Sequence, residues 1–115
     1  MPQSMNAAIT RGCGTVIVTA EEIVSNEEIR AQAENTIVPA FKTTCVVHVP
    51  FGSHPTPTLL ASRTDEDFFR YYAQISSTKE MFREFLDKYI YGTKDFAGYL
   101  QLIGEDRLEE LRRGI

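Results

Sequence analysis

The stretch "TCVVHVPFGSHP", Thr44 to Pro55, decides how this sequence can fold. Its first six residues are mostly apolar and β-branched, which is typical of a β-strand. Side chains alternate between the two faces of a strand, and here both faces are largely apolar: Cys45, Val47 and Val49 on one, Val46 and His48 on the other. Such a strand suits a sheet that is covered on both sides. Pro50 ends the strand and starts a loop.

A second strand is predicted upstream, at "TVIVTA", Thr15 to Ala20. Ser25 and Glu28 have the spacing of a capping box, which predicts a short helix from about Asn26. Pro39 then predicts a turn into the next element. Because two strands make a poor sheet, either more strands are hidden in the sequence or residues outside this chain complete the sheet.

The second half of the chain is predicted to be helical. Thr64 and Thr78 are expected to cap helices over 65–75 and 79–91, with Gly92 as the C-terminal stop. Two more helices are expected over 95–103 and 105–113, separated by Gly104. Four side chains of the second helix fall at helical spacing and predict its core face: Phe82, Phe85, Leu86 and Tyr89.

Four aromatic residues crowd the first of these helices: Phe68, Phe69, Tyr71 and Tyr72. They lie within five positions, so they cannot all face one core. Some of them are expected to contact another chain or a neighbouring segment.

Composition narrows the classes of function. The 115 residues fit one domain or a piece of one, and the net charge is −4 without any basic run. This disfavours binding to nucleic acid or to anionic membranes. There is neither an apolar stretch of membrane-spanning length nor a signal pattern, and residues 1–13 are expected to be a flexible lead-in. Two cysteines are too few for a disulfide framework, so a cytoplasmic protein with reduced thiols is expected.

Few residues are candidates for catalysis or for binding a ligand or a metal ion. His54, in a loop of glycine and prolines, could contact a ligand or move a proton, or it could be an ordinary loop histidine. A zinc site built from Cys13, Cys45, His48 and His54 is a remote alternative, because its spacing matches no strong metal motif. Glu21 and Glu22 are adjacent in a strand end and point to opposite faces, which makes them a poor carboxylate pair.

From about Gly14 onward, the chain resembles the alpha (A) subunit of family I CoA-transferases, and in particular the A subunits of the glutaconate CoA-transferase group. Val16 to Val24 matches a family strand, Ile37 to Phe41 matches an "IPGF" turn, and Val46 to Pro55 matches "VVEVPFGAHP". Residues 82–112 resemble the end of the subunit. The resemblance departs at Ala40, where the family has glycine, and at residues 42–45, where a family acid is lost. The family's N-terminal half, with its glycine-rich segment, is absent, so residues 1–115 resemble a C-terminal portion.

The resemblance implies an α/β fold: a partial open sheet of the CoA-transferase type with a helical C-terminal half. It also implies a partner beta subunit whose glutamate attacks the acyl-CoA thioester and carries the CoA to an acceptor acid. Coenzyme A is then a co-substrate, with neither a metal nor another cofactor. No catalytic residue is carried over to this chain, which is expected to be inactive without its missing half and the beta subunit.

Gly52, Ser53 and His54 match the family loop, apart from Ser53 where alanine is common, and they are the candidate substrate-binding residues. A ligand-facing His54 predicts that His54→Ala leaves folding nearly intact, whereas a structural corner predicts the opposite. Two other functions remain open. The chain could be a non-catalytic interaction or oligomerisation module derived from the family, or part of a relative that hydrolyses CoA thioesters.

Overall fold

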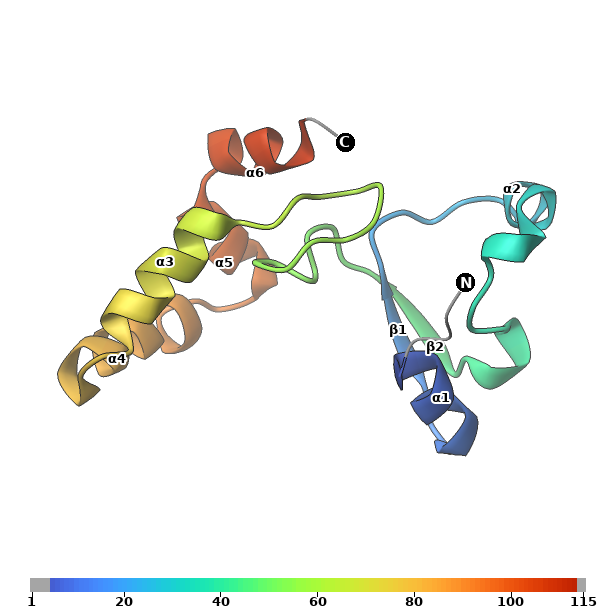
Figure 1. Ribbon diagram of the computed structural model, residues 1–115, viewed down its shortest axis with the longest axis horizontal. Helices are drawn as coiled ribbons and strands as arrows, with labels where there is room; N and C mark the ends of the chain where they lie inside the picture. The colour runs from blue at the N-terminus through green and yellow to red at the C-terminus, as the bar shows by residue number, and fades with distance from the viewer. Residues whose placement is uncertain (1–4, 114–115) are drawn as a thin grey trace. The chain divides into compact units, whose positions relative to one another are not determined.

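The computed structural model describes residues 5–113, which fall into two compact units, Met1–Gly52 and Ser53–Ile115. The first unit holds both strands and the second holds four α-helices (Figure 1). This confirms the predicted α/β class with a helical C-terminal half. None of the helices within the described residues is both long and apolar enough to cross a membrane.

The strands of the first unit form a two-stranded parallel sheet. β1 (Ile17–Ala20) pairs with β2 (Cys45–His48), with Ile17 opposite Cys45 and Ala20 opposite His48. Val49 N–H donates to Ala20 O at 2.8 Å, and Thr44 N–H donates to Val16 O at 2.8 Å, so hydrogen bonding continues past both ends. Both predicted strands are confirmed, each slightly shorter than expected.

Much of this sheet is exposed within the described residues, although Val18 and Ala20 are half-buried. Every residue of β2 is exposed, and so is Ile17 of β1, with 65% of its surface accessible. Residues 5–113 contain no other strand apart from one isolated bridge. A two-stranded sheet whose apolar side chains are largely exposed is not stable by itself. The structure therefore favours a sheet that residues outside this chain complete.

Short helical segments connect the strands. The predicted capping box is present at α2 (Asn26–Ala31): Glu28 N–H donates to Ser25 Oγ at 3.3 Å, and Ser25 N–H donates to Glu28 Oε2 at 2.9 Å. Two single 3₁₀ turns follow, η1 (Ala33–Asn35) and η2 (Ala40–Lys42). Pro39 precedes the second of them, which agrees with the predicted turn.

Residues 1–13 are not a flexible lead-in throughout, because Met5–Gly12 forms helix α1. Alanine favours helix formation, and Ala7 is only 5% exposed, so burial holds the helix in place. Thr10 Oγ1 also donates to Ala7 O at 2.7 Å. Residues 1–4 lie outside the described part of the chain.

The second unit contains α3 (Glu66–Ile75), α4 (Lys79–Leu86), the π-helical segment η3 (Asp87–Tyr91), α5 (Phe96–Ile103) and α6 (Glu105–Arg112). Thr78 caps α4 as predicted, but Asp65 rather than Thr64 caps α3. Its Oδ1 accepts from Phe68 N–H at 3.1 Å, because aspartate can reach this amide from the position directly before the helix.

Gly92 is the C-cap that ends η3, as predicted, but it does not use the left-handed conformation, since its φ is −79°. It is needed for space instead: a Cβ at this position would lie 2.4 Å from Asp87 O. By contrast, Gly104 has φ +93°, a conformation that favours glycine, and it separates α5 from α6 as predicted.

The core of the second unit is aromatic. Ile75, Phe85 and Tyr89 are buried at its centre, and further side chains pack against them: Phe68, Tyr71, Phe82, Leu86, Tyr99 and Ile103. All four core positions predicted for the second helix lie in this cluster. The crowded aromatics of α3 divide as expected: Phe68 and Tyr71 face the core, while Phe69 and Tyr72 are 42% and 40% exposed.

Candidate functional site: a buried histidine cluster

His54 lies at the centre of a buried polar cluster in the second unit. Its Nε2 is 3.0 Å from Asp65 Oδ2, and its Nδ1 is 2.6 Å from Tyr99 Oη. The side chains of His54 and Asp65 are only 2% and 3% exposed. The edge of the ring also packs against Phe68, with the ring centroids 4.9 Å apart. The imidazole is therefore enclosed by protein on its polar and apolar sides alike.

Asp65 anchors this cluster through both carboxylate oxygens. Oδ2 faces His54, while Oδ1 accepts from Phe68 N–H at 3.1 Å and from Arg107 Nη2 at 2.7 Å. Burial by itself would raise the pKa of Asp65. The hydrogen bonds from Arg107, His54 and Phe68 N–H, together with the charge of Arg107, outweigh burial and lower the pKa to about 2. Asp65 is thus a carboxylate at neutral pH.

The partners of His54 determine which ring nitrogen carries the proton in a neutral imidazole. The Asp65 carboxylate can only accept, so Nε2 donates to it and Nδ1 accepts from the Tyr99 hydroxyl. Burial, aided by nearby Tyr89 and Asp65, raises the pKa of Tyr99 to about 12. Tyr99 therefore keeps its proton and remains a donor over the physiological pH range.

Arg107 closes the cluster from α6. Its Nη2 donates to Asp65 Oδ1 at 2.7 Å and to Asp67 Oδ2 at 3.0 Å, and its Nη1 donates to Glu110 Oε2 at 2.7 Å. The hydrogen bonds to Asp65 and Glu110, above all the one to Asp65, raise the pKa of Arg107. A planar guanidinium suits such a bridge, because it offers several donors in a fixed fork. The cluster thereby ties α3, α5 and α6 to one loop.

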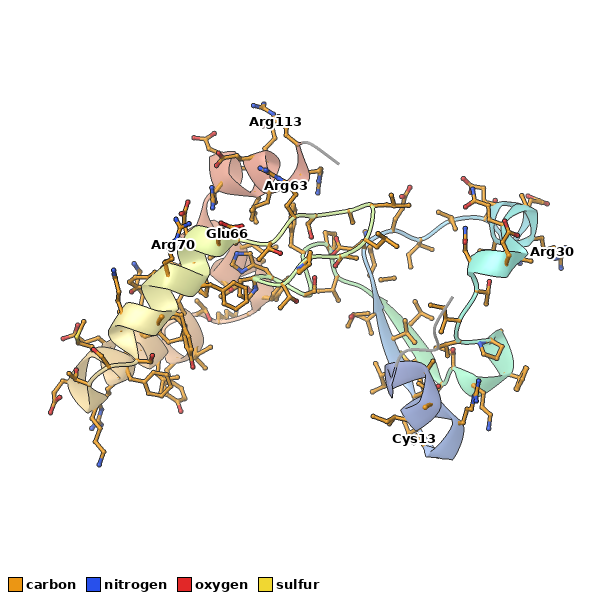
Figure 2. The ribbon with its side chains drawn as sticks, in the orientation of Figure 1. Cys13, Arg30, Arg63, Glu66, Arg70 and Arg113 are labelled. Atoms are coloured by element: carbon orange, nitrogen blue, oxygen red, sulfur yellow. The ribbon has the colours of Figure 1, made fainter. Side chains whose placement is uncertain are left out.

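The loop from Ser53 to α3 is itself ordered by hydrogen bonds. Ser53 Oγ lies 2.5 Å from Thr58 Oγ1 and donates to Thr56 O at 3.0 Å. Asp65 N–H donates to Pro55 O at 3.0 Å, and the peptide bond between His54 and Pro55 is cis. Arg63 lies beside α6 in Figure 2, and its Nη2 donates to Glu110 O at 2.8 Å. The loop is a compact element with defined contacts.

An apolar groove of about 590 Å³ borders the histidine cluster. Its walls include Phe69, Tyr72 and Phe96, and His54 and Tyr99 line it as well. A concave surface of this size and character is typical of a ligand or protein contact site. The predicted contact of surplus aromatics with another chain stays a prediction, and this groove is where such a contact would occur.

The other candidate residues lie elsewhere. Gly52 makes a close turn: its N–H donates to Val49 O at 2.9 Å, and an added Cβ would lie 2.9 Å from that same oxygen. His48 Nε2 lies 3.1 Å from Glu21 O, and Glu21 Oε2 accepts from Phe51 N–H at 2.8 Å. Cys13 and Cys45 are free and exposed. Among the described residues, no group of three or more His, Cys, Asp or Glu side chains is placed to hold a metal ion.

Sequence reasoning singled out His54 but missed the other three residues of the cluster: Asp65, Tyr99 and Arg107. Tyr99 lies 45 positions from His54, and Arg107 lies 42 positions from Asp65, so no local pattern joins them. The sequence indicated Asp65 only as an acidic residue at the start of a predicted helix. The hydrogen bonds of this cluster come from tertiary folding.

Comparison with known proteins identifies the class to which this fold belongs. No family model matches the chain. It is 35% identical over 96 residues to the A subunit of glutaconate CoA-transferase from Acidaminococcus fermentans, covering 84% of this chain and 30% of that protein. It is also 35% identical over 91 residues to the A subunit of 3-oxoadipate CoA-transferase from Pseudomonas knackmussii, covering 79% of this chain and 32% of the other. An uncharacterized protein of Archaeoglobus fulgidus is 40% identical over 106 residues, or 91% of this chain and 24% of that protein.

The structural comparison agrees with the sequence comparison. The crystal structure of glutaconate coenzyme A-transferase from Acidaminococcus fermentans superposes with a TM-score of 0.85 at 33% identity, covering 93% of this chain and 34% of that chain. The chain therefore resembles the family of CoA-transferase A subunits. Within it, the resemblance to the glutaconate and 3-oxoadipate enzymes is consistent with a C-terminal portion of the subunit. The chain spans about a quarter to a third of the length of the curated relatives that it matches.

Proposed function

We propose that this protein forms part of an enzyme that transfers CoA from an acyl-CoA to a carboxylic acid. The observation that carries the proposal is the agreement of two comparisons: curated relatives at 35% identity and a solved structure at TM-score 0.85 are all CoA-transferases. The largely exposed β1–β2 sheet supports a role as part of a larger structure. Coenzyme A enters as a co-substrate, and the proposal includes no metal or other cofactor.

The catalytic glutamate is proposed to lie on a partner beta subunit. The most deeply buried carboxylate described in this chain, Asp65, is a poor nucleophile, because three donors occupy its oxygens and its pKa is lowered to about 2. A carboxylate stabilised so strongly by fixed partners attacks a thioester slowly. The chain is then a scaffold that shapes one side of the acyl-CoA pocket together with the rest of an A subunit.

Gly52, Ser53 and His54 are proposed to lie on the substrate side, with different tasks. Both ring nitrogens of His54 already have protein partners, so His54 acts as a positioning residue that fixes the loop. Ser53 Oγ is engaged with Thr58 and Thr56, Gly52 N–H with Val49 O, and Ser53 O with Thr56. The Gly52 carbonyl and the Ser53 N–H are therefore the backbone groups proposed to meet substrate. Small residues allow a ligand to approach the backbone closely.

The cytoplasm is the proposed compartment. Cys13 and Cys45 are both free and exposed, as is usual where thiols stay reduced. CoA thioesters and a carboxylate acceptor would meet the protein there.

The test is CoA exchange between an acyl-CoA and isotopically labelled acetate. The 115-residue chain alone is expected to give no exchange, whereas the assembly isolated from its own cells is expected to exchange CoA and to contain a beta-type subunit. Trapping the assembly with hydroxylamine or borohydride during turnover should label a glutamate of that subunit. Exchange by the isolated chain would contradict the proposed location of the nucleophile. Release of free CoA without transfer to acetate would instead identify a thioester hydrolase relative.

A non-catalytic module is the second candidate, and the exposed apolar surface favours it. Val46, Val47 and Ile17 of the sheet are 54%, 41% and 65% exposed, a pattern that also suits self-association. This candidate predicts that native mass spectrometry of the protein from its own cells finds a homo-oligomer without a beta-type chain. An assembly containing such a chain and exchanging CoA would rule it out.

A further inference from the structure

The loop that precedes α3 (Figure 1) carries two neighbouring leucines with little cover from the rest of the chain. Leu59 and Leu60 are 82% and 83% exposed. They occupy the tip of a tight turn that Thr58 and Ser62 close: Thr58 N–H donates to Ser62 O at 3.1 Å, and Ser62 N–H donates to Thr58 O at 3.0 Å. We call these two residues the leucine pair.

The backbone of the leucine pair is unfavourable for its sequence. Leu60 has φ +63°, in the left-handed region that glycine and asparagine adopt far more easily than a bulky side chain does. Burial of the side chain would offset this cost, but the Leu60 side chain gains little from the chain's own packing because most of its surface is accessible. Non-glycine residues held in such conformations tend to mark functional positions.

Contacts with other residues of the second unit hold this turn in place. Ser53 Oγ lies 2.5 Å from Thr58 Oγ1, Ser62 is only 7% exposed, and Arg63 N–H donates to Leu111 O at 3.0 Å. The leucine pair is therefore presented in one conformation before any partner arrives. Such preorganisation reduces the entropy that an interface loses on binding.

Charge is absent from the surrounding sequence. The 14 residues from Val49 to Ser62 include no Asp, Glu, Lys or Arg, although these types make up 24% of the chain. A solvated loop normally carries such residues, whereas the buried centre of a protein interface is depleted in them. Exposed leucines in an uncharged loop therefore have the composition that is typical of the centre of a protein interface.

We infer that the leucine pair is a docking site for the second subunit of the CoA-transferase, which receives it in an apolar pocket. The inference rests on the proposed function. The relatives are named as A subunits, so a different chain is available as a partner. Hydrogen bonds within the loop already fix the conformation of its backbone around the leucine pair. This suits a contact that forms after this polypeptide has folded.

Photo-crosslinking tests the identity of the partner. A benzophenone amino acid replaces Leu59 in the protein as it occurs in its own cells, the assembly is purified and irradiated, and the cross-linked peptide is identified by mass spectrometry. The expected product joins position 59 to a chain with a beta-subunit sequence. A cross-link to this protein's own polypeptide or to a second copy, or no cross-link in an assembly that contains the beta subunit, would overturn the inference.

Paired variants separate docking from folding. Leu60→Gly relieves the left-handed strain, so the free chain is expected to keep or raise its unfolding temperature while the dissociation constant for the beta subunit rises about 10-fold or more. Leu59→Ser with Leu60→Asn should weaken association on the order of 100-fold, and the control Leu102→Asn, on the 41% exposed leucine of α5, should leave it unchanged. Unaltered association in Leu59→Ser/Leu60→Asn, or a lower unfolding temperature in Leu60→Gly, would contradict docking.

The two proposals fail in different ways. An assembly that exchanges CoA and contains the beta subunit, but cross-links elsewhere, disproves the docking site and leaves the proposed function standing. An assembly with neither exchange nor a second type of subunit disproves the proposed function, and the docking site with it.

Discussion

His54 Nε2 and Asp65 Oδ2 lie 3.0 Å apart, with side chains 2% and 3% exposed. The pair joins a loop residue to the N-cap of α3, and it is one of the hydrogen bonds that order the loop. An enclosed hydrogen bond to a charged group is costly to break, because the remaining partner stays away from water without its donor.

His54→Ala is expected to destabilise the second unit. The change leaves Asp65 Oδ2 and the Tyr99 hydroxyl without their partner, at a cost of about 2–3 kcal/mol. The unfolding temperature should fall by about 10–20 °C for a unit of this size. All five tyrosines lie beyond residue 70, so near-ultraviolet circular dichroism of tyrosine reports this unit alone.

His48→Ala is the matched control for this loss. His48 is exposed and has a single hydrogen bond, to Glu21 O. Its replacement should not move the tyrosine signal. Equal stability of His54→Ala and the parent chain would support the ligand-facing role predicted from sequence and would contradict the structural role.

Stability should fall in acid through Asp65. Its pKa is about 2 in the folded chain and near its ordinary value of 3.8 when unfolded, so the unfolded state takes up the proton first. The stabilisation, about 2 kcal/mol, is complete above pH 5 and is lost as the pH falls from about 4 towards 2. Urea unfolding at several pH values measures this slope.

Asp65→Asn isolates that contribution, because asparagine still caps α3 but does not titrate. The variant should be less stable than the parent at pH 7, and the difference should shrink as the pH falls. A difference that is constant from pH 7 to about pH 2.5 would show that the charge of Asp65 is not responsible.

Tyr99 should ionise later than an exposed tyrosine. Its pKa is raised to about 12, so the folded state favours the neutral phenol and loses this stabilisation as the pH rises from about 10 to 12. In an absorbance titration of tyrosinate, Tyr99→Phe should remove the most alkaline phase, whereas Tyr91→Phe, at a residue 74% exposed, should retain it. Loss of that phase in both variants would refute the assignment.

Arg107→Lys should cost about 1–2 kcal/mol. A lysine ammonium cannot reproduce the fork that contacts Asp65, Asp67 and Glu110 at once. The control Arg113→Lys alters an exposed pair with Glu109 and should change stability by less than about 0.5 kcal/mol. The double variant Asp65→Asn/Arg107→Lys should lose less free energy of unfolding than the sum of the losses in the two single variants. Strictly additive losses would contradict a direct interaction between Asp65 and Arg107.

Two glycines should respond to alanine with opposite signs. At Gly92 a Cβ would lie 2.4 Å from Asp87 O, so Gly92→Ala should destabilise by about 1–3 kcal/mol. At Gly98 the nearest heavy atom would be Thr93 Cβ at 3.5 Å, an ordinary contact, and Gly98→Ala should stabilise α5 by about 0.5 kcal/mol. Thermal unfolding followed by tyrosine dichroism compares them directly, and a shift of the same sign in both would be inconsistent with the packing.

Local sequence patterns predicted most of the secondary structure. Both strands, the Ser25–Glu28 capping box, the Thr78 cap and the core face of α4 depend on residues within a few positions of one another. The errors arose where a distant contact decided the outcome. Asp65 replaces Thr64 as the cap of α3 while it also binds Arg107, and burial of Ala7 makes a helix of residues that composition suggested were flexible.

The sequence by itself determined the α/β class, the order of elements and the likeness to the CoA-transferase alpha chain, because propensity, capping and alternation act over short distances. Only the tertiary structure decided that His54 lies enclosed between Asp65 and Tyr99, and that the leucine pair stands exposed. Burial and hydrogen bonding between residues tens of positions apart depend on how the helices, strands and loops pack together. A local sequence pattern does not specify that packing.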